Sequence, residues 1–199
     1  MGLPSIETYV NIIHPNKHKE VMAKLVENPD WDATITNALI VSSFSLLLLI
    51  ALELAIPTDI ASELNYSFSF FGIILSTILG FAMFFVSFWV MDKIAGLIFK
   101  TAPSFRKLTY LFSVLSVSLL PVSLLVMVGL FVINSGTAAI CIYFIVLMVV
   151  SIYSVYLQYR GVRATYPELS MFAAIAVYVL YGIAVLVLSS ITSAITGVV

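Results

Sequence analysis

The hydropathy pattern of this chain is dominated by five apolar segments, each containing a charge-free stretch long enough to cross a membrane. A hydrocarbon core about 30 Å thick requires roughly 20 residues of helix, because lipid offers the backbone no hydrogen-bond partners. The pattern therefore predicts an all-α, polytopic membrane protein. Its five predicted spans cover about residues 33–56, 67–91, 108–133, 138–159 and 169–196.

The first 32 residues have a different pattern, in which polar and apolar positions are mixed. Apolar residues recur at helical spacing on both sides of His14-Pro15-Asn16, which predicts two short amphipathic helices at the membrane surface. Asn28-Pro29-Asp30 is expected to form a turn and to supply a candidate N-cap of the first span. The chain therefore divides into a cytoplasmic amphipathic segment, 1–32, and a transmembrane domain, 33–199. The apolar positions of the two helices are Ile6, Tyr9, Val10 and Ile13, then Val21, Met22, Leu25 and Val26.

Composition agrees with a lipid environment, since 62% of the residues are hydrophobic, 10% are charged and the mean hydropathy is +1.14. A soluble domain of this length could not cover its surface with so few charges. The net charge of −1 does not favour a nucleic-acid partner.

The placement of the basic residues predicts the orientation of the chain. All nine fall in the N-terminal segment or in the connections after the second and fourth predicted spans, on one side of the membrane. The positive-inside rule makes that side cytoplasmic, so the N-terminus is expected inside and the C-terminus outside. These residues are Lys17, Lys19, Lys24, Lys93, Lys100, Arg106, Lys107, Arg160 and Arg163.

The spans contain no ionisable residue near their centres, which argues against proton-coupled transport and intramembrane catalysis. The two histidines, His14 and His18, lie near the N-terminus, and the single Cys141 lies in an apolar run. Asp92 and Lys93 are interpreted as charges at the cytoplasmic end of the second span. We therefore expect no enzymatic activity, no catalytic residues, no metal and no cofactor.

Small residues in the spans support two hypotheses. Gly72, Ser76 and Gly80 recur at intervals of four, which favours close packing of another helix, and Pro121 is expected to kink the third span. The alternative is a small channel or transporter for an ion or small solute, with a polar path along serines of the first, third and fifth spans near that kink. The serines of this path in the third span are Ser113, Ser116 and Ser123.

Three stretches of the chain resemble the Yip family, named for Ypt-interacting proteins, whose members share five membrane spans and a cytoplasmic N-terminus. The first is IIHPNKHKEVMAKLVENPDWDAT before the first span. The second is LTYLFSVLSVSLLPVSLL, with Tyr110, Ser116, Ser118 and Pro121. The third is the basic turn YRGVRATYPELSMFAA. Together the likeness covers nearly the whole chain.

The resemblance implies a membrane scaffold or trafficking-type factor, whose eukaryotic relatives reside in Golgi and endoplasmic reticulum membranes and engage Rab-type GTPases. This chain has neither the long cytosolic N-terminal region of those relatives nor an Asp-Leu-Tyr-Gly-Pro motif, so Rab binding is not carried over. Short loops suggest a prokaryotic or archaeal member in the cell membrane; a eukaryotic one would reside in the Golgi or endoplasmic reticulum. Expected partners are membrane lipid, a second copy or another membrane protein, and a cytosolic protein on the basic face.

Overall fold

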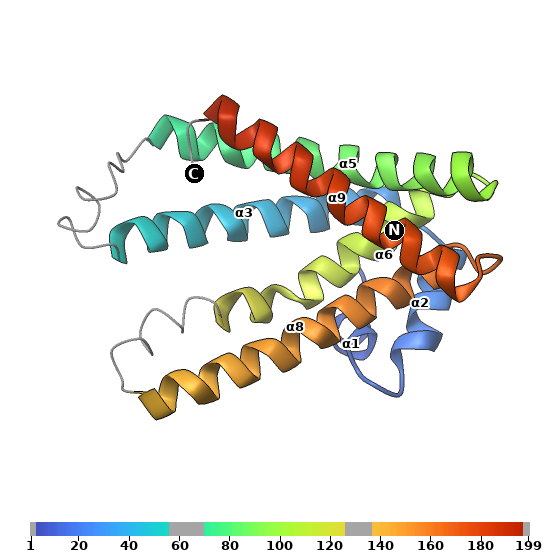
Figure 1. Cartoon of the computed structure of the whole chain (residues 1–199), viewed down its shortest axis with the longest axis horizontal. Coiled ribbons are helices and arrows are strands. Elements are labelled where there is room, and N and C mark those ends of the chain that lie inside the picture. Colours follow the sequence, from blue (N-terminus) through green and yellow to red (C-terminus); the bar gives the residue numbers. More distant parts are fainter. Residues whose placement is uncertain (1–2, 56–69, 126–136, 197–199) are drawn as a thin grey trace.

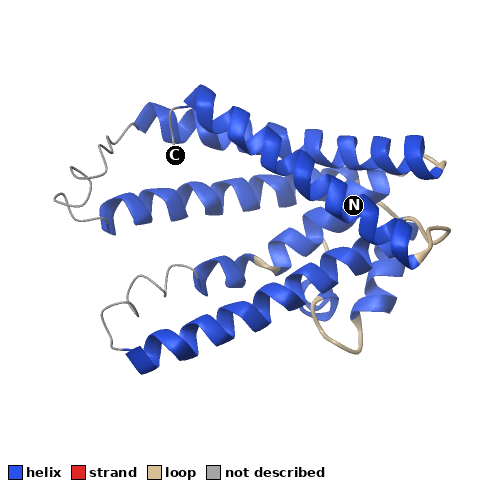
Figure 2. Ribbon diagram, viewed as in Figure 1, coloured by secondary structure: helices blue, strands red, loops and turns tan. Residues whose placement is uncertain are grey.

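The computed structural model describes residues 3–55, 70–125 and 137–196, and these residues form helices joined by short connections without any β-strand (Figure 2). The prediction of an all-α chain is therefore confirmed for the described residues. The parts of the predicted spans at residues 56, 67–69 and 126–133 lie outside them. The helices are α1 (Ile6–Ile12), α2 (His18–Glu27), α3 (Trp31–Ala55), α5 (Phe70–Phe99), α6 (Phe105–Ser118), α8 (Thr137–Thr165) and α9 (Met171–Thr196).

Five of these helices run alternately between the two ends of an elongated bundle, and the two short N-terminal helices pack at one end (Figure 1). Helix α5 lies along α9 and α3, and α3 also packs against α6. Helix α8 contacts α6 and α9, while α1 and α2 rest on α6 and α2 also contacts α8. The helix ends joined by short loops are therefore neighbours, as the sequence predicts for antiparallel spans.

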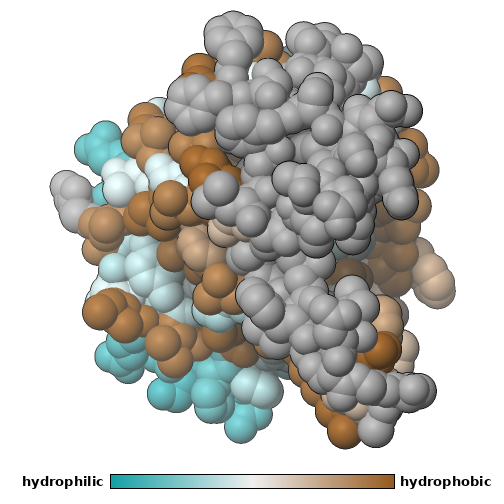
Figure 3. All heavy atoms as spheres, turned by 90° about the vertical axis from the view of Figure 1, so that its left-hand side faces the viewer, coloured by the Kyte–Doolittle hydropathy of each residue, from teal (hydrophilic) through white to brown (hydrophobic). Residues whose placement is uncertain are grey.

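Three helices of the described part are long and apolar enough to cross a membrane, by length and composition. Their apolar windows are Trp31–Leu48, Thr77–Phe99 and Ala139–Thr165, and α9 adds a shorter apolar stretch, Met171–Val187. Only 6% of the α8 window is buried inside the protein, so this helix presents apolar side chains outward, where lipid would cover them. Viewed along the bundle, many of the visible described side chains are hydrophobic (Figure 3).

Part of the buried apolar core lies where α1 and α2 meet α6 and α8. Ile12 and Met22 of the N-terminal helices are buried with Leu111 of α6 and Leu157 of α8. Close approach of α6 and α8 depends on Gly161, since a Cβ atom there would lie 3.1 Å from the Phe112 ring. The N-terminal segment is thus an integral part of the bundle end.

The two predicted N-terminal helices are present as α1 and α2, but the apolar face of α2 is covered by protein. Met22, Leu25 and Val26 are buried against the bundle, whereas Ile6 and Val10 of α1 stay exposed. The predicted N-cap is confirmed, because Asp30 Oδ1 accepts a hydrogen bond from the Ala33 N–H at 3.1 Å.

Two irregularities set the helix lengths at the basic end and in the third predicted span. Helix α5 continues for 30 residues, about 45 Å, so it extends beyond the hydrocarbon core before it ends at Lys100, whose φ is 56°. Helix α6 is interrupted at Leu119, two residues before Pro121, and the chain is helical again from 120 to 125. The interruption lies where proline removes a backbone donor, as the sequence predicts.

Candidate functional site at the basic end of the bundle

The structure brings the nine basic residues together at one end of the bundle, the end that carries α1 and α2 (Figure 1). They come from α2 and its N-cap, the end of α5, the start of α6 and the end of α8. We call this region the basic end. The shared location is what the alternating charge pattern of the sequence predicts. The residues are Lys17, Lys19, Lys24, Lys93, Lys100, Arg106, Lys107, Arg160 and Arg163.

A buried polar chain joins the first N-terminal helix to two long helices. The Tyr9 hydroxyl donates to Asn37 Oδ1 at 2.7 Å, and Asn37 Nδ2 donates to Ser113 Oγ at 3.2 Å. Ser113 in turn donates to the Tyr110 carbonyl oxygen at 2.8 Å. Burial raises the pKa of Tyr9, while its hydrogen bond to Asn37 acts in the opposite direction. Because Asn37 is fully buried, loss of either partner would leave a polar group without water.

Two tyrosines of α8 hold the connection between α1 and α2. The Tyr153 hydroxyl donates to the Ile13 carbonyl oxygen at 2.7 Å. The Tyr156 ring lies edge-on to buried His18, with centroids 5.6 Å apart, and its hydroxyl lies 3.4 Å from His18 Nε2. Both ends of the turn between the two N-terminal helices, at Ile13 and His18, are therefore held by α8.

The interpretation of Asp92 as a charge at a helix end is wrong in one respect, because its side chain is buried and bonded to two distant segments. Asp92 Oδ1 accepts from the Ser104 N–H at 2.7 Å and from the Tyr166 hydroxyl at 2.8 Å. Burial, followed by the hydrogen bond and the charge of Asp92, raises the pKa of Tyr166 well above its usual range. One carboxylate thus joins the end of α5 to the two connections that follow α5 and α8. Lys93 lies with Nζ 5.8 Å from the centre of the Trp89 ring.

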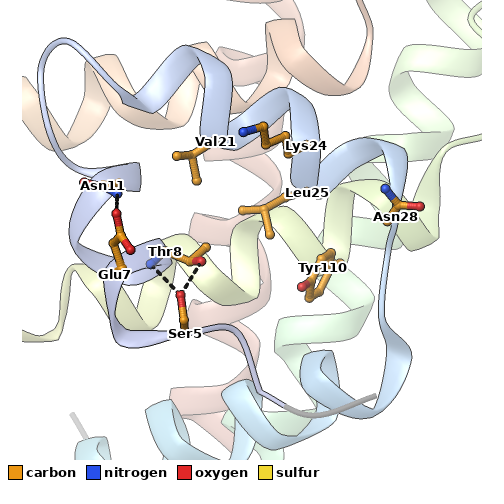
Figure 4. Close-up of a pocket in the computed structure, with 9 residues that line it drawn as sticks. All are labelled: Ser5, Glu7, Thr8, Asn11, Val21, Lys24, Leu25, Asn28 and Tyr110. Carbon is orange, nitrogen blue, oxygen red and sulfur yellow. Dashed lines mark hydrogen bonds between the residues drawn. The ribbon is translucent and has the colours of Figure 1, made fainter.

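A cavity of about 350 Å³ opens between the N-terminal helices, above Tyr110 of α6 (Figure 4). Its wall carries charges of both signs, since Glu7 and Lys24 both line it. Glu7 accepts from Asn11 at 3.2 Å, and Lys24 forms a 2.7 Å ion pair with Glu20. Because the two charges of the wall have opposite signs and each has a local partner, this cavity offers no concentrated charge to a ligand.

A second cavity, of about 280 Å³, lies between α2 and the end of α8. Its lining contains three of the basic residues and no carboxylate. Among the residues that the structure describes, no three His, Cys, Asp or Glu side chains lie close enough together to hold a metal ion. The second cavity therefore differs from the first, because all the charged residues that line it are cationic.

The predicted packing residues occupy different environments. Gly72 is buried on α5, whereas Gly80 is exposed, and a Cβ atom added there would meet nothing within 4 Å. Pro121 is exposed, and Ser76 lies on α5, its side chain outside the described part of the structure. Packing through Gly80 stays a prediction that requires a second helix from outside this chain.

The serines of the predicted polar path do not share one environment. Ser113 is buried and bonded to Asn37, while Ser116 and Ser123 are half-buried. Neither of the two cavities described above is lined by any of these three residues. No observation in the described residues favours a path along these serines.

Sequence reasoning missed the hydrogen bonds that organise the basic end. It interpreted Tyr9 as an apolar-face position and Asp92 as a span-end charge, and it did not single out Asn37 or Tyr166. Each of these four residues is polar and lies in or beside an apolar segment, which was the available signal. Their side-chain partners lie 28 to 76 residues away, so no local pattern could identify them.

Comparison with known proteins gives one finding. A family model described as Yip1 domain matches residues 11–191, which is most of the chain. No curated protein and no solved structure matches the chain.

Proposed function

The chain belongs to the Yip1 domain family, and from this premise we propose that it is a non-enzymatic membrane scaffold of the trafficking type. In this proposal it acts by associating with other helices in the bilayer and by presenting its basic end to lipid or to a cytosolic protein. The family match and the outward-facing apolar helices establish an integral membrane protein. The role within the membrane is the proposal.

The proposal includes five membrane crossings, by α3, by α5, by the third predicted span, 108–133, whose described part includes most of α6, and by α8 and α9. It places the N-terminus and the basic end in the cytoplasm and the C-terminus outside, because lysine and arginine are retained on the cytoplasmic side during insertion. The membrane is the cell membrane if the protein is prokaryotic, and that of the Golgi or endoplasmic reticulum if it is eukaryotic.

The observation that carries the proposal is the fixed arrangement of the N-terminal helices at the basic end. Hydrogen bonds from Tyr9 and Tyr153 attach the segment to α3 and α8, and buried Met22 anchors α2. A surface held in one arrangement before binding loses less conformational entropy when a partner docks. Such a preformed cationic surface suits a scaffold more than a flexible tail would.

Helix association is supported by the open face of α5. Gly80 is exposed in a largely apolar stretch of α5, and a Cβ atom added there would meet nothing within 4 Å. A small residue within an apolar helix face allows the backbone of a second helix to approach closely. The chain itself does not use this face near Gly80, so a second copy or another membrane protein is the proposed occupant.

The test replaces Gly80 with leucine and measures self-association by energy transfer between labelled copies in liposomes at decreasing protein-to-lipid ratios. Gly182→Leu on α9 is the matched control, because a Cβ atom there also meets nothing within 4 Å. Both variants should fold, and Gly80→Leu alone should weaken association. Equal energy transfer in the two variants and the unmodified protein would contradict association through this face.

A further inference from the structure

Three cationic side chains converge on the cavity between α2 and α8. Arg160 and Arg163 are three residues apart and therefore lie on one face of α8, and Lys19 reaches the cavity from α2. The rest of the lining is apolar or small, and consists of Met22, Ala23, Ala164 and Pro167. The cavity thus combines a concentrated positive charge with an apolar wall.

The three cations have no anionic partner within the described part of the chain. The ion pair observed there joins Lys24 to Glu20, and it does not involve this cavity. Glu168 follows Pro167 in sequence but does not line the cavity. Like charges held close together repel each other unless a counter-charge is bound, so the arrangement calls for an anion.

We propose that this cavity binds the phosphate of an anionic phospholipid in the cytoplasmic leaflet. Arginine is the side chain best suited to phosphate, because its planar guanidinium donates two parallel hydrogen bonds to neighbouring oxygens. A cavity of about 280 Å³ at the small end of the usual range fits a headgroup rather than a large soluble ligand. Anionic lipids are the phosphate compounds concentrated at a cytoplasmic membrane surface.

The surface of α8 beside the cavity supports a lipid over free phosphate. Met148, Ile152 and Tyr156 precede Arg160 at intervals of four residues and form one stripe on the helix. They are exposed by 58%, 62% and 39%. From Arg160 to Met148 the stripe spans about 18 Å, close to the roughly 15 Å depth of one leaflet. An acyl chain can therefore follow α8 while its phosphate occupies the cavity.

This inference rests on the proposed function in one respect, namely that the basic end lies at the cytoplasmic membrane surface. It does not depend on self-association, and lipid binding can be measured on a single copy. The Gly80→Leu variant therefore separates the two: it should keep lipid binding even where association is lost.

The experiment compares nanodiscs that contain phosphatidylcholine alone with nanodiscs that contain added phosphatidylglycerol. Native mass spectrometry of the released protein counts the lipids that remain bound. The variant pair Arg160→Gln and Arg163→Gln removes two charges from the cavity. The matched control, Arg106→Gln and Lys107→Gln, removes two charges from exposed positions of the same basic end.

The unmodified protein should retain phosphatidylglycerol in preference to phosphatidylcholine, and the cavity variant should bind it at least about tenfold more weakly. The control variant should lose little. Equal retention of the two lipids, or equal losses in the two variants, would overturn the proposal in favour of diffuse electrostatic attraction. Displacement of the bound lipid by millimolar inorganic phosphate, with phosphate then held by the protein, would also overturn it, because the ligand would be a free anion.

Discussion

Replacing Tyr166 with phenylalanine tests the buried junction at Asp92 with the smallest change in shape. The substitution removes one hydroxyl, which donates to Asp92 at 2.8 Å and belongs to a fully buried side chain. A hydrogen bond to a charged acceptor contributes about 1.5 to 3 kcal/mol to stability. We therefore expect the free energy of unfolding to fall by about 2 kcal/mol.

Asp92→Ala should cost more, because it leaves two donors without an acceptor. The Tyr166 hydroxyl and the Ser104 N–H would both lose their partner, and each unpaired buried group costs about 1 to 3 kcal/mol. The expected loss is about 3 to 5 kcal/mol. Since the two residues act on one bond, the double variant should cost clearly less than the sum of the single ones.

The measurement is unfolding of the purified protein in mixed micelles with increasing dodecyl sulfate, followed by circular dichroism. Tyr178→Phe is the matched control, because its hydroxyl also donates one bond, to the neutral Gln158 side chain at 2.9 Å. That bond should contribute about 0.5 to 1.5 kcal/mol. A loss of stability in the double variant equal to the sum of the losses in Tyr166→Phe and Asp92→Ala would refute the coupling. A Tyr166→Phe loss no larger than that of Tyr178→Phe would refute the charged, buried bond.

Three further predictions concern packing and pH. Asn37→Leu should loosen α1, because it removes the partner of the Tyr9 hydroxyl. A cysteine introduced at buried Ile12, in a chain otherwise free of cysteine, should then react with a maleimide about tenfold faster. An unchanged rate would mean that the hydrogen bonds of Asn37 do not hold the helix. Gly161→Ala should be less stable than Gly182→Ala by about 1 to 3 kcal/mol in the same unfolding assay. Both variants gain the helix propensity of alanine, but only the Cβ atom at residue 161 would lie 3.1 Å from an α6 ring, so equal stabilities would refute this contact. Because the pKa of Tyr166 is raised in the folded protein, above about pH 10 the unfolded chain releases a proton that the folded protein keeps. The stability advantage of the unmodified protein over Tyr166→Phe should therefore shrink by up to about 1.4 kcal/mol per pH unit. A constant difference from about pH 8 to 11 would contradict the assignment.

The long helices and the collection of charge at one end could be predicted from the sequence, because both follow from local properties. Apolar runs of sufficient length require helix in lipid, and basic residues between them fall on alternate connections. A cap within Asn28-Pro29-Asp30 was predicted from its position before an apolar run, and the structure identifies the capping residue as Asp30. These features depend on residues that lie close together in the sequence, so the sequence alone is enough to predict them.

The contacts that fix the basic end could not be predicted, because they join residues far apart in sequence. Asn37 bonds to a serine 76 residues later, and Tyr153 bonds to a carbonyl 140 residues earlier. Their pairing depends on which helix faces cross. The same limit explains the glycines: the periodic stripe drew attention to Gly80, while the close contact within the chain is at Gly161, an isolated glycine beside two arginines.

The most direct test of the account asks which side of the membrane carries the basic end. Cys141, which is exposed on α8, is first replaced with serine, and single cysteines are then placed at Lys107 and at Thr137. Sealed membrane vesicles of known orientation are treated with a membrane-impermeant maleimide. We predict that Lys107→Cys reacts only from the cytoplasmic side and Thr137→Cys only from the opposite side. Labelling of both positions from one side, or of Lys107→Cys from outside, would contradict the proposed arrangement of the bundle and its cytoplasmic basic end.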